Sequence, residues 1–180
     1  LPDWTAALPD LGKSLELRPR SDDSWILRGR LRTDWALHLQ RKGQDPGELY
    51  ASALSDFSEA IDVNPGSASA HMHRGVAGIN FGQAQSARGK DPEPVWAAAL
   101  RDFDAADSRK PSSALILSHR GIVRQEWAQY RTRRGKDGSE LLAAALADFD
   151  AAIRVNPGYP ESRMRRGIVN VALLGADATD

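Results

Sequence analysis

The chain contains no cysteine among its 180 residues. This absence excludes disulfide bonds, thiolate metal sites and a cysteine nucleophile, and it leaves the compartment open, with the cytoplasm favoured. No apolar run approaches the roughly 20 residues of a membrane-spanning helix, and no segment has the pattern of a signal peptide. Because 24 Lys+Arg balance 24 Asp+Glu, no net charge attracts nucleic acid or an acidic membrane surface. We therefore expect neither nucleic acid nor a membrane as a partner.

The sequence also lacks the patterns of β-strands and of catalytic sites. No segment alternates with period two, so no strand is predicted. There is no Gly-rich phosphate loop, nucleophile elbow or zincin motif. A hydrophobic content of 41% with five Trp is nevertheless ample for a folded core. We predict a folded protein that is not an enzyme and that needs no cofactor.

What the chain does contain is a pattern that recurs every 46 residues without a slip. Such self-similarity is the mark of a stacked repeat array, in which each repeat contacts only its neighbours. It favours an extended interaction surface over a single catalytic pocket. The recurring residues are Asp10, Asp56, Asp102 and Asp148; Arg28, Arg74, Arg120 and Arg166, each followed by Gly; and Pro19, Pro65, Pro111 and Pro157.

The first full repeat has the pattern of two helices joined by a turn. Ser21 or Asp22 can cap the first helix, and apolar residues follow at three- and four-residue steps. Gly43 can adopt the left-handed conformation that ends this helix. Asp45 is expected to cap the second helix, with Pro46 at its first position. Arms of about 18–20 residues would each be roughly 27–30 Å long.

We call the first helix of each repeat helix A and the second helix B, and we expect one domain over residues 1–180. Pro9 lies in the first helix B, which it should kink or delay. Because the chain starts at Leu1 in mid-repeat, we expect it to be a fragment of a larger regulatory protein or a processed form. The expected segments are 1–21 (helix B only), three full repeats at 22–67, 68–113 and 114–159, and a terminal helix A at 160–180.

These residues resemble the tetratricopeptide repeat (TPR), whose unit has 34 residues. Gly29 matches the small residue of that family's helix A, while Ala53, Phe57, Ala60 and Pro65 fall at its helix B offsets. The same matches recur in the next two repeats. The resemblance implies an all-α fold, a right-handed solenoid of antiparallel helix hairpins.

The repeat departs from the family by 12 additional residues, which lie between Gly29 and Ala53. We expect them to lengthen both helices and to add a second layer of core. Two aromatic-rich positions should pack together there, because buried aromatic pairs add roughly 0.5–1.5 kcal/mol beyond area burial. The alternative is that some of these rings are exposed binding anchors. The residues are Trp35, Phe81, Trp127 and Leu173 on helix A, and Trp4, Tyr50, Trp96 and Leu142 on helix B.

The recurring arginines and aspartates suggest a structural role. Our hypothesis is an Arg–Asp ladder in which each guanidinium pairs with a carboxylate, because such pairing is geometrically specific. The alternative is that the arginines bind an acidic ligand, although a ligand seldom needs all four copies.

Two other polar clusters are interpreted as ordinary surface. His71 and His73 lie two residues apart, so they face different ways on a helix and cannot readily share one metal ion. His119 repeats the position of His73, but neighbouring repeats stand too far apart for ligation at roughly 2 Å. We predict no metal site. The basic residues Arg131, Arg133, Arg134 and Lys136 are expected to be solvated and to compensate a helix dipole.

The resemblance also implies a function. TPR-like arrays usually bind extended peptides or a partner helix on a concave face lined by helix A, so we expect a protein–protein interaction or scaffolding module. The family's clamp for a C-terminal carboxylate needs Lys and Asn where this chain has Ile26 and Arg30, so that function is not supported. The expected contact residues, here called the partner face, are Arg30, Met72, Val76, Ile79, Asn80, Ser118, Ile122, Gln125, Met164 and Ile168.

Two alternatives to this hypothesis stay open. The longer arms can close part of the groove, which would make Val76 and Ile122 ordinary core. Alternatively, the chain can self-associate end to end, because no helix B follows the last helix A and its apolar residues, Ile168 among them, would be exposed.

Overall fold

The computed structural model describes residues 4–177, which form eight α-helices and no strand. The chain separates into two compact units, Leu1–Val95 and Trp96–Asp180, with the boundary inside α5 (Glu93–Arg109). Each helix pair falls inside one predicted repeat. That all the repeats form one domain remains a prediction.

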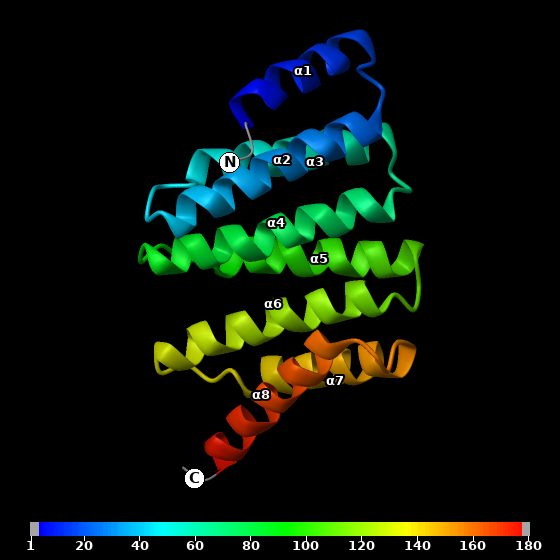
Figure 1. Ribbon diagram of the computed structural model, residues 1–180. Helices are drawn as coiled ribbons and strands as arrows, with labels where there is room; N and C mark the ends of the chain where they lie inside the picture. The colour runs from blue at the N-terminus through cyan, green and yellow to red at the C-terminus, as the bar shows by residue number, and fades with distance from the viewer. Residues whose placement is uncertain (1–3, 178–180) are drawn as a thin grey trace. The chain divides into compact units, whose positions relative to one another are not determined.

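Unit 1 contains the first four helices, arranged as consecutive antiparallel hairpins (Figure 1). The second helix packs against the other three, and the third also packs against the fourth. The two A helices have 20 residues each and the third helix, which is the B helix of the first full repeat, has 17, close to the predicted lengths. The bounds are α1 Trp4–Leu17, α2 Asp22–Arg41, α3 Gly47–Val63 and α4 Ala68–Ala87.

Unit 2 repeats this arrangement after the part of α5 that begins at Trp96 (Figure 1). Helix α6 (Ala114–Arg133) packs against α7 (Ser139–Val155) and α8 (Pro160–Asp177), and α7 packs against α8. The predicted fold class, an all-α solenoid of lengthened TPR-like hairpins, is confirmed. No helix in the described part of the chain is long and apolar enough to cross a membrane.

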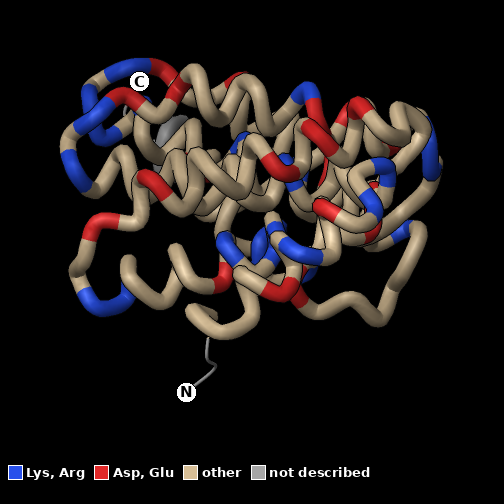
Figure 2. The backbone as a smooth tube through the Cα atoms, turned by 90° about the horizontal axis from the view of Figure 1, so that it is seen from above, with Lys and Arg blue, Asp and Glu red and all other residues tan. Residues whose placement is uncertain are grey.

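Helix starts and stops follow the local chemistry of the repeat. The Ser21 hydroxyl caps α2 by accepting a hydrogen bond from the Ser24 amide at 3.2 Å, and Ser67 caps α4 in the same way. After α2, Gly43 has φ +73°, a left-handed conformation that glycine adopts without steric cost. Basic and acidic residues are interspersed along the chain (Figure 2), in keeping with its zero net charge.

Two predicted helix starts need correction. Helix α3 begins at Gly47 rather than Pro46, and Pro46 is its N-cap residue. The Pro46 carbonyl accepts the first hydrogen bond of the helix, from the Tyr50 amide. Pro9 does not delay α1, which includes Trp4, five residues earlier. A proline there removes one backbone hydrogen bond, and Pro9 is exposed.

The predicted second layer of core is present in unit 1. One apolar cluster surrounds Phe57 and includes Ile26 from helix A. A second cluster joins Ala36 and Tyr50 to Ala84 of the next repeat. Because Ala36 and Tyr50 belong to the lengthened part of the hairpin, the extra residues bring their own core.

The two aromatic positions pack together across successive repeats, as predicted. In unit 1 the rings of Trp4 and Trp35 stack with centroids 6.4 Å apart, and those of Tyr50 and Phe81 lie 5.6 Å apart. Tyr50 is fully buried, and burial raises the pKa of its phenol. In unit 2 the ring of the buried Trp96 packs edge-on against the Tyr130 ring, a contact that the sequence reasoning missed.

Candidate partner-binding face

The helix A glycine is required because an aromatic ring of helix B lies directly on it. A Cβ added at Gly29 would lie 2.8 Å from the Phe57 ring, and one at Gly121 would lie 2.8 Å from the Phe149 ring. Carbon atoms pack favourably near 3.5–4.0 Å, so neither site has room for a methyl group. At Gly167, by contrast, no heavy atom lies within 4 Å of the added Cβ. This close approach brings helix A and helix B together in the α2–α3 hairpin of unit 1 and the α6–α7 hairpin of unit 2.

The Arg–Asp ladder is present in both units, where Asp56 and Asp148 each accept hydrogen bonds from two arginines. In unit 1, Arg28 donates to Asp56 from Nε and Nη2, the shorter bond at 2.7 Å, and Arg32 donates to the other carboxylate oxygen at 2.6 Å. In unit 2, Arg120 makes the same bonds to Asp148, and Arg124 takes the place of Arg32. The second arginines were missed, although they stand two repeat periods apart in the sequence.

Three of the four recurring arginines also contact the preceding helix B. Arg120 reaches Asp104 at 2.9 Å, and Arg166 reaches Asp150 at 3.0 Å. Arg74 donates to Ser58 at 3.0 Å, again 16 residues earlier. The side chains of Arg28 and Arg120 are each only 18% exposed. This geometry supports the structural role over the binding of an acidic ligand.

The partner face divides by exposure. Ile79, Ser118, Ile122 and Gln125 are buried, so they have little surface to offer a ligand. The burial of Ile122 agrees with the alternative in which this residue is ordinary core.

The remaining residues of the partner face keep surface. Met72, Val76 and Asn80 lie along one side of α4 in unit 1, and each is half-buried. Arg30 on α2 is exposed and occupies the same repeat position as Val76. Met164 and Ile168 on α8 of unit 2 are exposed. Ile26 is buried against Phe57 and α4.

The histidines pack on the core rather than gather around an ion. The His73 ring stacks on Phe57, and the His119 ring stacks on Phe103. Within residues 4–177, no group of three His, Asp or Glu residues could hold a metal ion.

We expect His119 to make the stability of unit 2 depend on pH. Burial lowers its pKa below 6.5, so folding favours the neutral ring. The contribution is complete above about pH 6.5 and is lost as pH falls towards the folded-state pKa, because the unfolded chain binds the proton first. Urea unfolding at pH 7.5 and 5.0 should show a smaller difference in His119→Asn than in the unchanged chain. An equal difference in both would contradict this.

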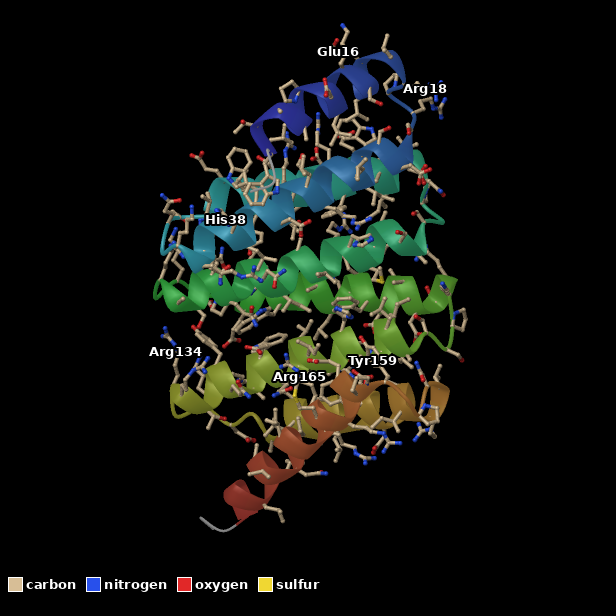
Figure 3. The ribbon with its side chains drawn as sticks, in the orientation of Figure 1. Glu16, Arg18, His38, Arg134, Tyr159 and Arg165 are labelled. Carbon is tan, nitrogen blue, oxygen red and sulfur yellow. The ribbon has the colours of Figure 1, made fainter. Side chains whose placement is uncertain are left out.

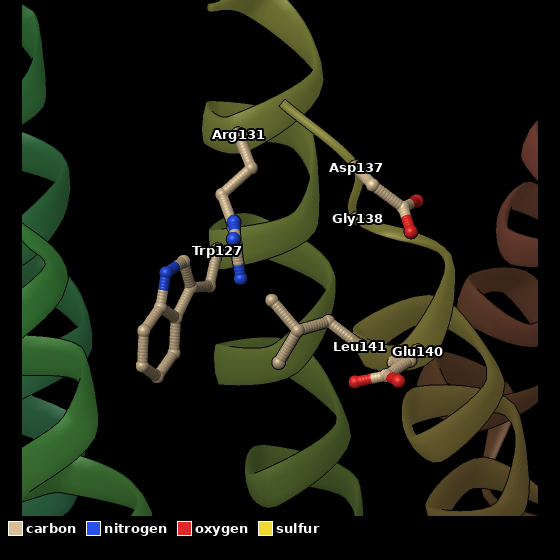
Figure 4. Close-up of a pocket in the computed structure, with 6 residues that line it drawn as sticks. All are labelled: Trp127, Arg131, Asp137, Gly138, Glu140 and Leu141. Carbon is tan, nitrogen blue, oxygen red and sulfur yellow. The ribbon is translucent and has the colours of Figure 1, made fainter. Parts of the chain in front are cut away.

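Unit 2 also contains a pocket of about 420 Å³ at the turn between α6 and α7 (Figure 4). Its lining includes Trp127 and Arg131, on the side of α6 opposite to Ser118 and Ile122 by helical periodicity. The Trp127 indole N–H and the Arg131 Nε–H are buried and find no hydrogen-bond partner in the described part of the chain. The Ser139 amide holds the pKa of Asp137, also in the lining, below its usual value. Sequence reasoning had treated this segment as solvated surface and missed the pocket.

Comparisons with known proteins agree with this geometry. Residues 47–90 match the family model of the tetratricopeptide repeat. No curated protein matches the sequence. The chain is thus a TPR-like helix-hairpin protein with an elongated repeat of 46 residues.

Solved structures with a similar fold are TPR proteins of low sequence identity. A crystal structure of MamA superposes with a TM-score of 0.66 at 15% identity, covering 95% of this chain and 80% of that one. The first TPR of Spaghetti (RPAP3), bound to the HSP90 peptide SRMEEVD, has a TM-score of 0.54 at 15% identity, with 83% and 95% covered. A thermophilic TPR protein of Thermus thermophilus has a TM-score of 0.50 at 18% identity, with 93% and 91% covered.

Proposed function

We propose that the chain is a protein-interaction module that binds a peptide or a partner helix on its A helices. The observation that carries the proposal is the half-buried row of Met72, Val76 and Asn80 on α4. Side chains at steps of four line one side of a helix, and an amphipathic helix binds by laying its apolar face along such a row. The exposed Arg30 of α2 adds one cation beside this row.

The fold comparison supports the proposal through one neighbour. The RPAP3 domain of similar fold is described with a bound HSP90 peptide, so a hairpin array of this kind can hold a peptide. The partner of this chain should differ in chemistry, because Val76 and Met72 offer apolar contact rather than a clamp for a carboxylate. We therefore expect an amphipathic segment with an apolar side.

Selection from a random peptide display library can test this. Peptides that bind the chain should lose affinity at least about tenfold when Met72 and Val76 are both replaced by Asp, because each carboxylate would be desolvated against an apolar partner. Fluorescence anisotropy with a labelled peptide measures the change.

The matched control is Val155→Asp. Val155 is an exposed apolar residue at the end of α7, and Arg109 stands at the same position one repeat earlier, so a charge is tolerated there. If the Val155 variant loses as much affinity as the double variant, or if neither loses any, the partner face lies elsewhere.

A further inference from the structure

We infer that the pocket at the turn between α6 and α7 binds a small zwitterion of the amino-acid class. The carboxylate of the ligand would lie at Arg131, and its ammonium group would lie towards Asp137 and Glu140. This pocket is separate from the row on α4, so the inference is independent of the proposed peptide binding. Its volume of about 420 Å³ lies in the range of small-molecule sites, about 300–1,000 Å³. All of its lining residues belong to unit 2.

Arg131 is a cation without a counter-ion in the described part of the chain. Its side chain is half-buried, its Nε–H finds no acceptor, and no ion pair of its guanidinium is found within residues 4–177. The indole N–H of Trp127, one turn earlier on α6, is also a buried donor without an acceptor. Buried donors are normally paired, and an unpaired one is costly. These two donors therefore point to a bound acceptor, and a carboxylate fits a guanidinium with two parallel hydrogen bonds.

The other side of the pocket carries the opposite charge. Asp137 and Glu140 lie on the turn and at the start of α7, across the pocket from Arg131 (Figure 4). The Ser139 amide and hydroxyl donate to the Asp137 carboxylate at 2.8 and 3.0 Å. These bonds, with a smaller effect of the Arg131 charge, hold the pKa of Asp137 below its usual value. Asp137 is therefore negatively charged at neutral pH.

This separation of charge favours a zwitterion over a simple anion or cation. An anion held by Arg131 would face two carboxylates, and a cation held by the carboxylates would face the guanidinium. Like charges that face each other weaken binding, whereas a ligand with both charges finds a partner on each side. The Leu141 side chain lies in the lining between them (Figure 4), so we expect an amino acid with an apolar side chain.

The repeat pattern separates Arg131 from the residues that build the hairpins. In the two preceding repeats the same position holds Leu39 and Gln85, so a helix hairpin forms without a cation there. The ladder arginines, by contrast, recur in every copy. A role in binding therefore explains Arg131 better than a role in folding, and Arg131→Gln reproduces a residue that the preceding repeat already accommodates.

NMR titration followed by the indole N–H signals of the five Trp tests the proposal. The Trp127 signal is assigned with Trp127→Phe, because Phe81 stands at this position one repeat earlier. Each common α-amino acid is added to about 10 mM, which detects millimolar affinity. At least one apolar amino acid should shift the Trp127 signal to saturation. The corresponding amine and carboxylic acid, which each carry one of its two charges, should bind at least about tenfold more weakly.

Two variants test the two sides of the pocket. Arg131→Gln should weaken binding of that amino acid at least about tenfold and remove its advantage over the corresponding amine, because the carboxylate loses its partner. Glu140→Gln replaces an exposed residue, so the core stays intact. It should reduce the advantage of the amino acid over the corresponding carboxylic acid, because only Asp137 then faces the ammonium group.

The control is Arg134→Gln, which removes the same charge three residues after Arg131. Arg134 lies at the end of α6 (Figure 3), over the Tyr130 ring and outside the pocket lining, so this variant should bind like the unchanged chain. The proposal is overturned if no amino acid shifts the Trp127 signal to saturation, or if the amine or the carboxylic acid binds as tightly as the amino acid. It also fails if Arg131→Gln, folded by circular dichroism, binds no more weakly than Arg134→Gln. If Arg131→Gln does not fold, unchanged selectivity in Glu140→Gln is the contradicting result.

Discussion

Replacing Asp148 by alanine is expected to lower the free energy of unfolding of unit 2 by about 3 kcal/mol, the lower end of the range for breaking a buried ion pair. The Asp148 side chain is 4% exposed and accepts hydrogen bonds from Arg120 and Arg124, whose side chains are 18% and 23% exposed. Without the carboxylate, two guanidinium groups remain partly desolvated and face each other. Urea unfolding followed by circular dichroism and tryptophan fluorescence measures the loss.

The chain supplies its own control for this substitution. Asp10 occupies the same repeat position but is exposed, so Asp10→Ala should change the stability by no more than about 0.5 kcal/mol. Equal losses in the two variants would show that the ladder contributes nothing specific to the fold.

Replacing Gly121 by alanine is expected to cost about 2 kcal/mol, within the range for overpacking a core. The new methyl group would lie 2.8 Å from the Phe149 ring, and the strain exceeds the gain of roughly 1 kcal/mol in helix propensity. Adding Phe149→Leu should recover part of the loss, because leucine removes the aromatic ring that the new methyl group would meet. Thermal and urea unfolding report both effects.

Gly167, at the same repeat position on α8, is the control site for the Gly121→Ala substitution. Because nothing lies within 4 Å of its Cβ position, Gly167→Ala should be neutral or stabilise the chain by up to about 1 kcal/mol through helix propensity. If the two alanine substitutions change the free energy of unfolding equally, the close approach of α6 and α7 is not the reason that position 121 requires glycine.

These contrasts show how much the repeat period can predict. Arginine and aspartate recur at fixed positions, such as Arg28 and Asp56, so their pairing could be inferred without coordinates. Residues present in only some copies were harder to interpret. Arg32 and Arg124 share a position that is Gly78 in the repeat between them, and the pattern was therefore missed.

The partner face was the least predictable part, for a physical reason. Offsets from a glycine place a residue on one side of a helix, but they do not say how far the next helix covers it. Ile26 and Ile79 are thus core residues, whereas Arg30 is exposed. The pocket beside Trp127 and Arg131 could not be inferred either, because it depends on side chains that lack partners rather than on a repeated motif.

The chain has only two methionines, Met72 and Met164, and both lie on the A helices. Labelling their methyl groups with ¹³C gives two NMR signals, each assigned by one substitution. Titration with a selected peptide at low protein concentration should shift the Met72 signal and leave Met164 in place, because the proposed partner row lies on α4. A peptide that binds with the same affinity while the Met72 signal stays unchanged would contradict the proposed function.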